Sequence, residues 1–171
     1  MAEVVKEVKT KAVTKTATTT IRLFFHKKKS VSLSFEDIAY NMSNEEGLYA
    51  LYVLRWLIED KQIEIVEGKF ILTEKGAIML LQDIFNFRYI TTAELLLRLI
   101  KSPFSPLEWR KIKMDIRFLP YKFGIRSTIS KKTMRNATTE LVKRGIVNED
   151  GEFIIKIEEF KYLVQAMHTY T

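Results

Sequence analysis

The sequence predicts a mostly α-helical protein with small β hairpins, an α+β fold in which one structural plan occurs twice. Three observations lead to this class. Apolar residues recur at three- and four-residue steps in several segments, which is the spacing of one helix face. Two β-rich runs each surround a turn signal, at Glu67–Gly68 and at Glu149–Gly151. An offset of 83 residues places the first hairpin and the helix before it on the second pair.

The first predicted elements are an arm and a short helix. Residues 1–20 are rich in threonine and lysine and lack periodicity, which predicts a flexible basic arm. The run "IRLFF" at 21–25 fits either a strand or the start of a short helix. Ser34 and Asp37 have the spacing of a capping box, in which each side chain binds a backbone amide near the other residue. A helix is therefore expected over residues 35–42.

A longer helix, a hairpin and a third helix follow. The run "EEGLYALYVLRWLIED" carries an apolar stripe over residues 45–60, with Ser43 or Asn44 as its cap. The run "IEIVEGKFIL" alternates between apolar and polar residues around its turn and predicts a hairpin. Thr73 can cap a helix over residues 74–87. Since this helix is apolar on more than one side, it is either well buried or used as an interface.

The second half repeats this order with four further helices, two of which come before the stretch that leads to the second hairpin. Thr91 or Thr92 opens a helix over residues 93–101. The run from Ser105 combines a capping box with a proline at the first helical position, and it predicts a helix over residues 106–119.

The last predicted helices flank the second hairpin. Ser130 caps the run "KKTMRNATTELVKR", and Gly145 follows it where a left-handed residue commonly ends a helix. The inward stripe of this helix is predicted to be Met134, Ala137, Leu141 and Val142. The run "IVNEDGEFIIKI" predicts the second hairpin, and "EEFKYLVQAM" predicts a final amphipathic helix.

The repeat defines the domain boundaries. After the arm at 1–20, a first unit is expected at 21–90 and a second at 91–171. The matched positions at the offset of 83 are Leu51 with Met134, Ile58 with Leu141, Ile63 with Ile146, Gly68 with Gly151, Phe70 with Phe153 and Ile71 with Ile154. These positions are predicted core and turn positions, which favours two copies of one supersecondary plan.

Composition excludes several function classes. The chain has 171 residues, 47% of them hydrophobic and 29% charged, which is typical of a globular protein with a core. No apolar run is long enough to cross a bilayer and no signal peptide is visible, so a cytoplasmic, nucleoid-associated protein without a membrane partner is expected. There is no cysteine and there are only two histidines, far apart. We therefore expect no metal, no cofactor and no enzymatic activity.

Charge is unevenly distributed along the chain. The net charge of +7 includes −5 over residues 30–100 and +9 over residues 101–144. The second of these segments contains twelve basic and three acidic residues. A basic segment of this kind can displace the counterions of several phosphates, whereas the acidic segment would be repelled by them. Any contact with nucleic acid is therefore expected from one part of the protein and not from its acidic middle, and the basic arm, with a net charge of +6 over residues 1–29, would add nonspecific affinity.

These patterns resemble a known superfamily. The run "SLSFEDIAYNM…EGLYALYVLRWLIEDKQIEIVEGKFILTEKG" resembles the winged helix-turn-helix superfamily, in which "LTEKG" is common just after the hairpin wing, and "TTELVKRGIVNEDGEFII" resembles a second copy. The resemblance implies two tandem winged helix-turn-helix domains, similar in style to small DNA-binding proteins of thermophilic archaea and their viruses. In this family one helix enters the major groove and the wing approaches the backbone or the minor groove.

Carried onto this chain, the resemblance implies double-stranded DNA as a partner and a DNA-binding surface on the second unit. Arginine can bind guanine and asparagine can bind adenine, while lysines and hydroxyls serve phosphates. The candidate DNA-binding residues are Lys131, Lys132, Thr133, Arg135, Asn136, Thr139, Arg110, Lys111, Lys113, Arg117, Lys122 and Arg126. Glu149 and Asp150 make the tip of the second wing acidic, so that tip is a poor phosphate contact. A merely solvated basic face remains the alternative.

The first unit fits a protein interface better than a DNA contact. Its longest helix is acidic at both ends and presents Tyr49, Tyr52 and Trp56, which are the candidate partner residues. One hypothesis is a transcriptional regulator that works as a homodimer through this unit. The other is a non-enzymatic subunit of a larger transcription, replication or chromosome-organising complex, which acts mainly through protein contacts.

Overall fold

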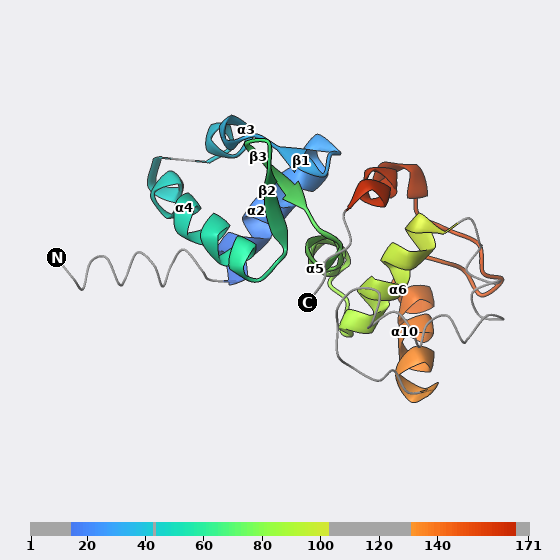
Figure 1. The fold of residues 1–171 in the computed structure, drawn as a ribbon. Helices are drawn as coiled ribbons and strands as arrows, with labels where there is room; N and C mark the ends of the chain where they lie inside the picture. The colour runs from blue at the N-terminus through green and yellow to red at the C-terminus, as the bar shows by residue number, and fades with distance from the viewer. Residues whose placement is uncertain (1–14, 43, 103–130, 167–171) are drawn as a thin grey trace.

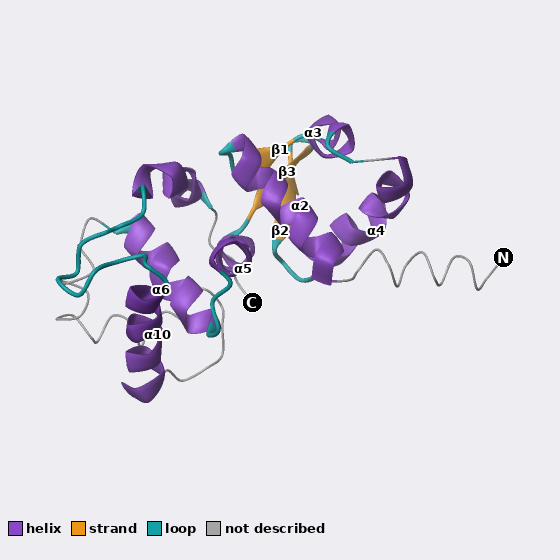
Figure 2. Cartoon of the chain, turned by 180° about the vertical axis from the view of Figure 1, so that it is seen from behind, coloured by secondary structure: helices purple, strands orange, loops and turns teal. Residues whose placement is uncertain are grey.

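The computed structural model describes residues 15–42, 44–102 and 131–166. These residues form seven helices and one three-stranded antiparallel sheet (Figures 1 and 2). In chain order the elements are α2 (Lys15–Lys28), β1 (Ser32–Leu33), α3 (Phe35–Tyr40), α4 (Asn44–Glu59), β2 (Ile63–Val66), β3 (Lys69–Leu72), α5 (Glu74–Phe85), α6 (Ile90–Lys101), α10 (Lys131–Lys143) and η1 (Ile157–Gln165). The predicted α+β class is confirmed. The helix predicted over residues 106–119 lies outside the described residues.

The first described helix begins inside the predicted arm. α2 starts at Lys15, five residues before the predicted end of the arm, and it contains the run "IRLFF", which is helical and not extended. Its buried face consists of Thr18, Ile21, Arg22 and Phe25, at positions i, i+3, i+4 and i+7. Burial of this face outweighs the low helix propensity of the threonines, and for that reason composition placed the boundary too late. Residues 1–14 lie outside the described residues.

The sheet has the strand order β1-β3-β2 and belongs to the first half of the chain. Its hairpin is confirmed: Val66 pairs with Lys69, and the two turn residues Glu67 and Gly68 both have positive φ angles, 51° and 76°. Strand β1 pairs with β3 through only two residues, among them the buried Leu33. A strand this short shows no alternation in sequence, so it was not predicted.

Two of the predicted helix caps are confirmed. The Ser34 hydroxyl accepts from the Asp37 amide at 3.1 Å, while the Asp37 carboxylate accepts from the Ser34 amide at 2.8 Å. Lys28 pairs with the same carboxylate at 2.7 Å, and these contacts lower the pKa of Asp37 to about 2. The Thr73 hydroxyl accepts from the Gly76 amide at 3.2 Å at the start of α5. Both caps satisfy amides that a helix start leaves unpaired.

The predicted cap of α6 is wrong. Thr91 and Thr92 both lie inside the helix, which begins at Ile90 with Tyr89 as its N-cap and no side-chain cap from that residue. A carboxylate from another helix, Glu140 of α10, occupies this end of α6 instead. A carboxylate 48 residues away in the sequence leaves no local pattern at the start of α6. The local sequence therefore favoured a threonine as the cap, because threonine is a common N-cap residue.

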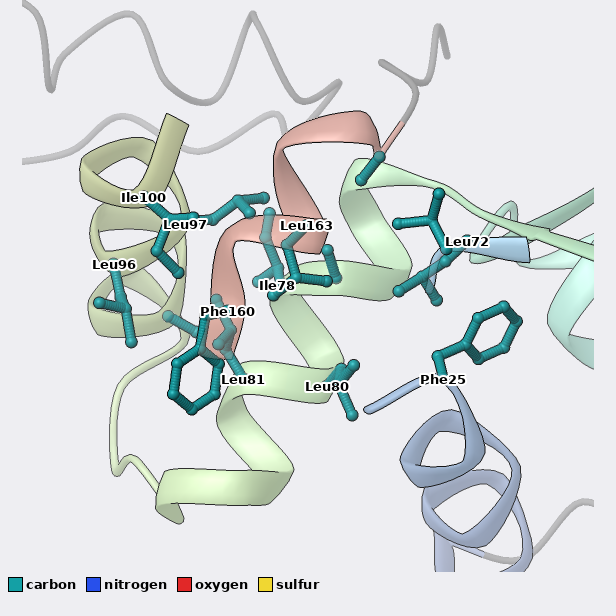
Figure 3. Packing of buried hydrophobic residues seen from close by; sticks show 14 of the residues in the cluster. Phe25, Leu72, Ile78, Leu80, Leu81, Leu96, Leu97, Ile100, Phe160 and Leu163 are labelled. Carbon is teal, nitrogen blue, oxygen red and sulfur yellow. The ribbon is translucent and has the colours of Figure 1, made fainter. Parts of the chain in front are cut away.

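Helix α5 joins the two halves. It packs on α2 on one side and on α6 on the other, while η1 packs on α6. Figure 3 shows Leu80 of α5 near Phe25 of α2, and Leu81 near Phe160 of η1. The buried residues form one cluster that runs from Ile21 to Ala166. Both predicted units therefore contribute to a single hydrophobic core, which resembles the close packing within one domain.

The C-terminal hairpin and helix are less regular than predicted. The second hairpin is reduced to one antiparallel bridge between Val147 and Phe153, although Gly151 has the positive φ of 85° that its turn requires. The final helix η1 is a 3₁₀ helix. It buries Phe160 and Leu163 at a three-residue spacing, which suits three residues per turn.

The ends of α4 and α10 have the same hydrogen-bond pattern, at an offset of 84 residues and not 83. At the end of α4, the Lys61 and Gln62 amides donate to the carbonyls of Ile58 and Leu57. At the end of α10, the corresponding donors are Gly145 and Ile146, and the acceptors are Val142 and Leu141. Lys61 and Gly145 both have positive φ angles, 62° and 73°. The offset of 83 aligns the hairpin glycines but pairs the exposed Leu51 with the half-buried Met134 in the helices.

Candidate nucleic-acid interface

Helix α10 presents one exposed face to solvent and one buried face to the core. Lys132, Arg135, Thr139 and Lys143 are exposed, and their spacing of three and four residues places them along one side. Ala137 and Leu141 are buried on the other side, while Met134 and Val142 pack against the core as the predicted stripe requires. α10 packs on α6 through this buried side.

The exposed face of α10 carries cations without carboxylate partners among the described residues. Lys132, Arg135 and Lys143 take part in no ion pair there. The one acidic residue of the helix, Glu140, is buried and points away from this face. Cations on one helix face without carboxylate partners in the described part of the chain favour contact with the phosphates of nucleic acid.

The remaining candidate DNA-binding residues divide into three groups. Thr133 and Asn136 are half-buried at the flanks of the exposed face, so the structure brings them close to Lys132 and Arg135. Lys131 is the first residue of α10, and its side chain is outside the described part of the structure. The following candidates lie outside the described residues: Arg110, Lys111, Lys113, Arg117, Lys122 and Arg126.

Sequence reasoning missed Glu140, which fixes α10 to the junction between α5 and α6. One carboxylate oxygen of Glu140 accepts from the Arg88 amide at 2.5 Å, and the other accepts from the Tyr89 amide at 3.1 Å and from the Thr92 hydroxyl at 2.6 Å. Burial raises the pKa of Glu140, but these three donors outweigh burial and hold the pKa below its usual value. One feature of the sequence could have indicated this role: Glu140 is the only acidic residue of a basic helix, and it is next to the inward residue Leu141.

The hairpin that follows α10 carries acidic side chains near its tip. Glu149, Asp150 and Glu152 are exposed, and Ile154 is 59% exposed. The turn is closed by the Asn148 amide, which donates to the Glu152 carbonyl at 2.9 Å. The predicted acidic tip therefore has a defined geometry, and its sign disfavours contact with phosphate.

The corresponding helix of the first half, α4, has a different exposed face. Arg55 is paired with Glu59 at 3.1 Å, so its charge is compensated within the helix. Leu51 is 64% exposed and Trp56 is 38% exposed beside this pair. Figure 1 places α4 and α10 on opposite sides of α5, so the two faces are separate surfaces of the molecule. The α4 face lacks the free cations of α10.

The predicted partner residues of α4 do not form one exposed aromatic face. Tyr49 and Tyr52 are half-buried and pack against the core, and only Trp56 is clearly exposed. A three-residue spacing placed the tyrosines on one side of the helix, but that side lies at the edge of the buried stripe. Among the described side chains of α4, the most exposed apolar one is Leu51, which sequence reasoning assigned to the core.

Other kinds of site find no support in the described part of the chain. Residues 15–42, 44–102 and 131–166 contain no group of three histidine, cysteine or carboxylate side chains placed to hold a metal ion. None of the helices described is both long and apolar enough to span a bilayer.

Comparison with known proteins adds no further assignment. No protein-family model matches the chain, and neither a curated protein nor a solved structure matches it. The functional argument therefore depends on the residues and their geometry.

Proposed function

We propose that this protein binds double-stranded DNA with α10 as its reading helix, within a tandem pair of winged helix-turn-helix units, and acts as a transcriptional regulator. Arg135 and Asn136 would contact base edges, and the lysines of α10 would contact phosphates. The first unit would supply a protein contact and not a second DNA contact.

The order of elements supports the tandem arrangement. In the first half, the helices α3 and α4 are followed directly by the β2–β3 hairpin and then by α5. In the second half, α10 is followed by the smaller hairpin and then by η1. α5 packs on α2 as η1 packs on α6, so the helix after each hairpin returns to the first helix of its own half. The matched helix ends at the offset of 84 support the same relationship.

The observation that carries the proposal is the exposed face of α10. It presents Lys132, Arg135 and Lys143 on one side of a helix whose opposite side is fixed in the core. A rigid helix with unpaired cations and polar side chains on one face can enter a major groove without rearrangement. α4, the helix at the corresponding position, combines a compensated arginine with exposed apolar side chains.

Replacing Lys132 and Arg135 together by alanine is expected to weaken binding to a mixed-sequence duplex by about tenfold or more at low salt. The slope of log affinity against log salt concentration should become shallower by about 0.9 for each phosphate that the variant no longer neutralises. Fluorescence anisotropy of a labelled duplex, titrated at several salt concentrations, measures both quantities. Circular dichroism checks that each variant keeps the helical content and the thermal unfolding midpoint of the wild type.

The matched control is Arg55→Ala on α4, which removes an arginine from an exposed helix face of the first half. This variant should bind DNA as the wild type does. If Arg55→Ala weakens binding as much as the double variant does, the proposed surface is wrong. If the wild type shows no salt-dependent binding to duplex DNA, the proposed function is wrong.

A second candidate function, protein contact through the first unit, is favoured by exposed apolar side chains there. Leu51 is 64% exposed, Ile65 is 59% exposed and Tyr40 is 90% exposed. Covering exposed apolar side chains with a partner removes them from water, which is the main favourable term in protein association. We propose that they mediate self-association, as a dimeric regulator requires.

Changing Leu51 to glutamine is expected to shift the protein from dimer to monomer, because a polar side chain replaces an apolar one where two copies meet. Sedimentation velocity over a range of concentrations measures this shift. The control is Val164→Gln, an equivalent change at an exposed apolar residue of η1. A wild-type protein that sediments as a monomer at every concentration would rule out self-association.

A further inference from the structure

Glu140 is the only carboxylate of α10, and it faces the junction between the two halves of the chain. Its side chain is buried and accepts three hydrogen bonds, from the amides of Arg88 and Tyr89 and from the hydroxyl of Thr92. Two of these donors precede α6 and one lies in its first turn. A single side chain of α10 thus fixes the start of α6, immediately after α5 ends.

The rest of the buried face of α10 is apolar, and its contacts do not depend strongly on direction. Ala137 and Leu141 pack against the core through van der Waals contacts, which have no preferred direction. Hydrogen bonds to a charged acceptor are directional and stronger than neutral ones. The hydrogen bonds of Glu140 therefore define the angle and register of α10 against α6.

We propose that Glu140 is a positioning residue for DNA binding: it fixes the orientation in which α10 presents its exposed cations. This inference rests on the proposed function, because it concerns the same surface. Glu140 does not touch DNA, since its side chain is buried and accepts its hydrogen bonds from the start of α6. It acts through the angle of the helix, and breaking its hydrogen bonds lowers DNA affinity even when the protein remains folded.

The chemistry of these hydrogen bonds allows a decisive substitution. In Glu140→Gln, one of the two carboxylate oxygens becomes an NH₂ group, which donates and cannot accept. Each oxygen of Glu140 receives a backbone amide, so the NH₂ group must face an N–H donor on one of the two sides. The length of the side chain is unchanged, and the helix propensity of glutamine is close to that of glutamate. The variant therefore loosens the junction with little other change.

Electrostatics alone predicts the opposite result. Removing a negative charge from the basic helix should raise the affinity for phosphate. It would also release Arg144, whose guanidinium lies 3.9 Å from the Glu140 carboxylate. A decrease of affinity in Glu140→Gln therefore cannot come from charge, and the sign of the change separates positioning from electrostatic repulsion.

The experiment measures DNA affinity of the full-length Glu140→Gln variant by anisotropy, well below the midpoint of its thermal unfolding. A role limited to stability leaves affinity unchanged under these conditions, because all the protein is folded. We expect affinity to fall by about fivefold or more, with a salt slope like that of the wild type because the phosphates are still neutralised. The control Glu152→Gln makes the same chemical change at an exposed residue of the hairpin and should bind equally well or more tightly.

A second variant reports on the same hydrogen bonds without touching the charge. Thr92→Val replaces the hydroxyl that donates to Glu140 by a methyl group of similar size. It should lower DNA affinity in the same direction, by about twofold or more. The effects of Thr92→Val and Glu140→Gln should be less than additive, because both disrupt the same junction. If Glu140→Gln fails to fold, Thr92→Val decides the question.

The outcomes are distinguishable from failure of the proposed function. If Lys132→Ala with Arg135→Ala weakens binding but Glu140→Gln and Thr92→Val bind as tightly as the wild type or more tightly, Glu140 is not a positioning residue and the proposed function stands. If the wild type does not bind duplex DNA, both proposals are overturned together.

Discussion

Replacing Arg22 by methionine is expected to lower the free energy of unfolding by about 3–5 kcal/mol. Arg22 is 2% exposed, and its guanidinium donates to both carboxylate oxygens of Asp83 on α5, at 2.6 and 3.2 Å. A third bond joins Arg22 to the Gln62 side chain at 3.0 Å. Methionine keeps much of the length of arginine but leaves the buried Asp83 charge unpaired. Urea denaturation followed by circular dichroism measures the change.

Two further variants test the cause of this destabilisation. In Arg22→Met with Asp83→Leu, both charges of this pair are removed, so most of the stability should return. Arg55→Ala breaks the exposed pair with Glu59 and should change the free energy of unfolding by about 0.5 kcal/mol or less. If Arg22→Met alone is as stable as the wild type, the buried pair does not connect α2 to α5 as the structure indicates.

Replacing Glu94 by glutamine is expected to stabilise the protein at alkaline pH by about 3 kcal/mol. Glu94 lies within α6, is 1% exposed, and one of its carboxylate oxygens has no hydrogen-bond partner among the described residues. Burial raises the pKa of Glu94 to about 7, from an ordinary value of 4.5. Glutamine has a similar shape and carries no charge, so it avoids the cost of a buried carboxylate.

The direction of the pH dependence follows from the raised pKa. In the folded protein Glu94 keeps its proton over the range in which the unfolded chain releases it, so wild-type stability falls as pH rises from about 4.5 to about 7. The gap between Glu94→Gln and the wild type should be small near pH 4 and full by pH 8. Urea titrations at both pH values measure it, with the exposed Glu152→Gln as a control that should show no such gap. If the difference in unfolding free energy between Glu94→Gln and the wild type is the same at both pH values, the pKa of Glu94 is not raised in the folded protein.

The predictable parts of the fold are those set by neighbouring residues. Ser34 and Thr73 cap their helices because an acceptor and its amides lie within three residues of each other. The turn at Glu67–Gly68 needs two positive φ angles. A glycine in a two-residue loop between two strand-like runs is typical of such a turn, so the hairpin could be predicted. The α+β class follows from such local signals. The start of α2 does not, because its threonines are helical only through burial of residues such as Ile21 against the rest of the core.

The candidate site was predictable in its exposed half only. Lys132 and Arg135 could be placed on the outer face because the apolar stripe of Ala137 and Leu141 fixes the opposite one. The role of Glu140 could not be predicted, because its donors come from 48 to 52 residues earlier in the chain. For the same reason no local pattern shows that Arg22 is buried against Asp83, which lies 61 residues later in the chain.

The central claim is that α10, and not α4, lies against duplex DNA. The chain contains no cysteine, so a single Thr139→Cys or Leu51→Cys substitution gives one unique attachment point for an iron–EDTA reagent on either helix. Both residues are exposed, and neither substitution changes the charge of the protein. The account predicts that the reagent on residue 139 cleaves a bound duplex and that the reagent on residue 51 does not. Cleavage from residue 51, with none from residue 139 while both labelled proteins bind, would contradict it.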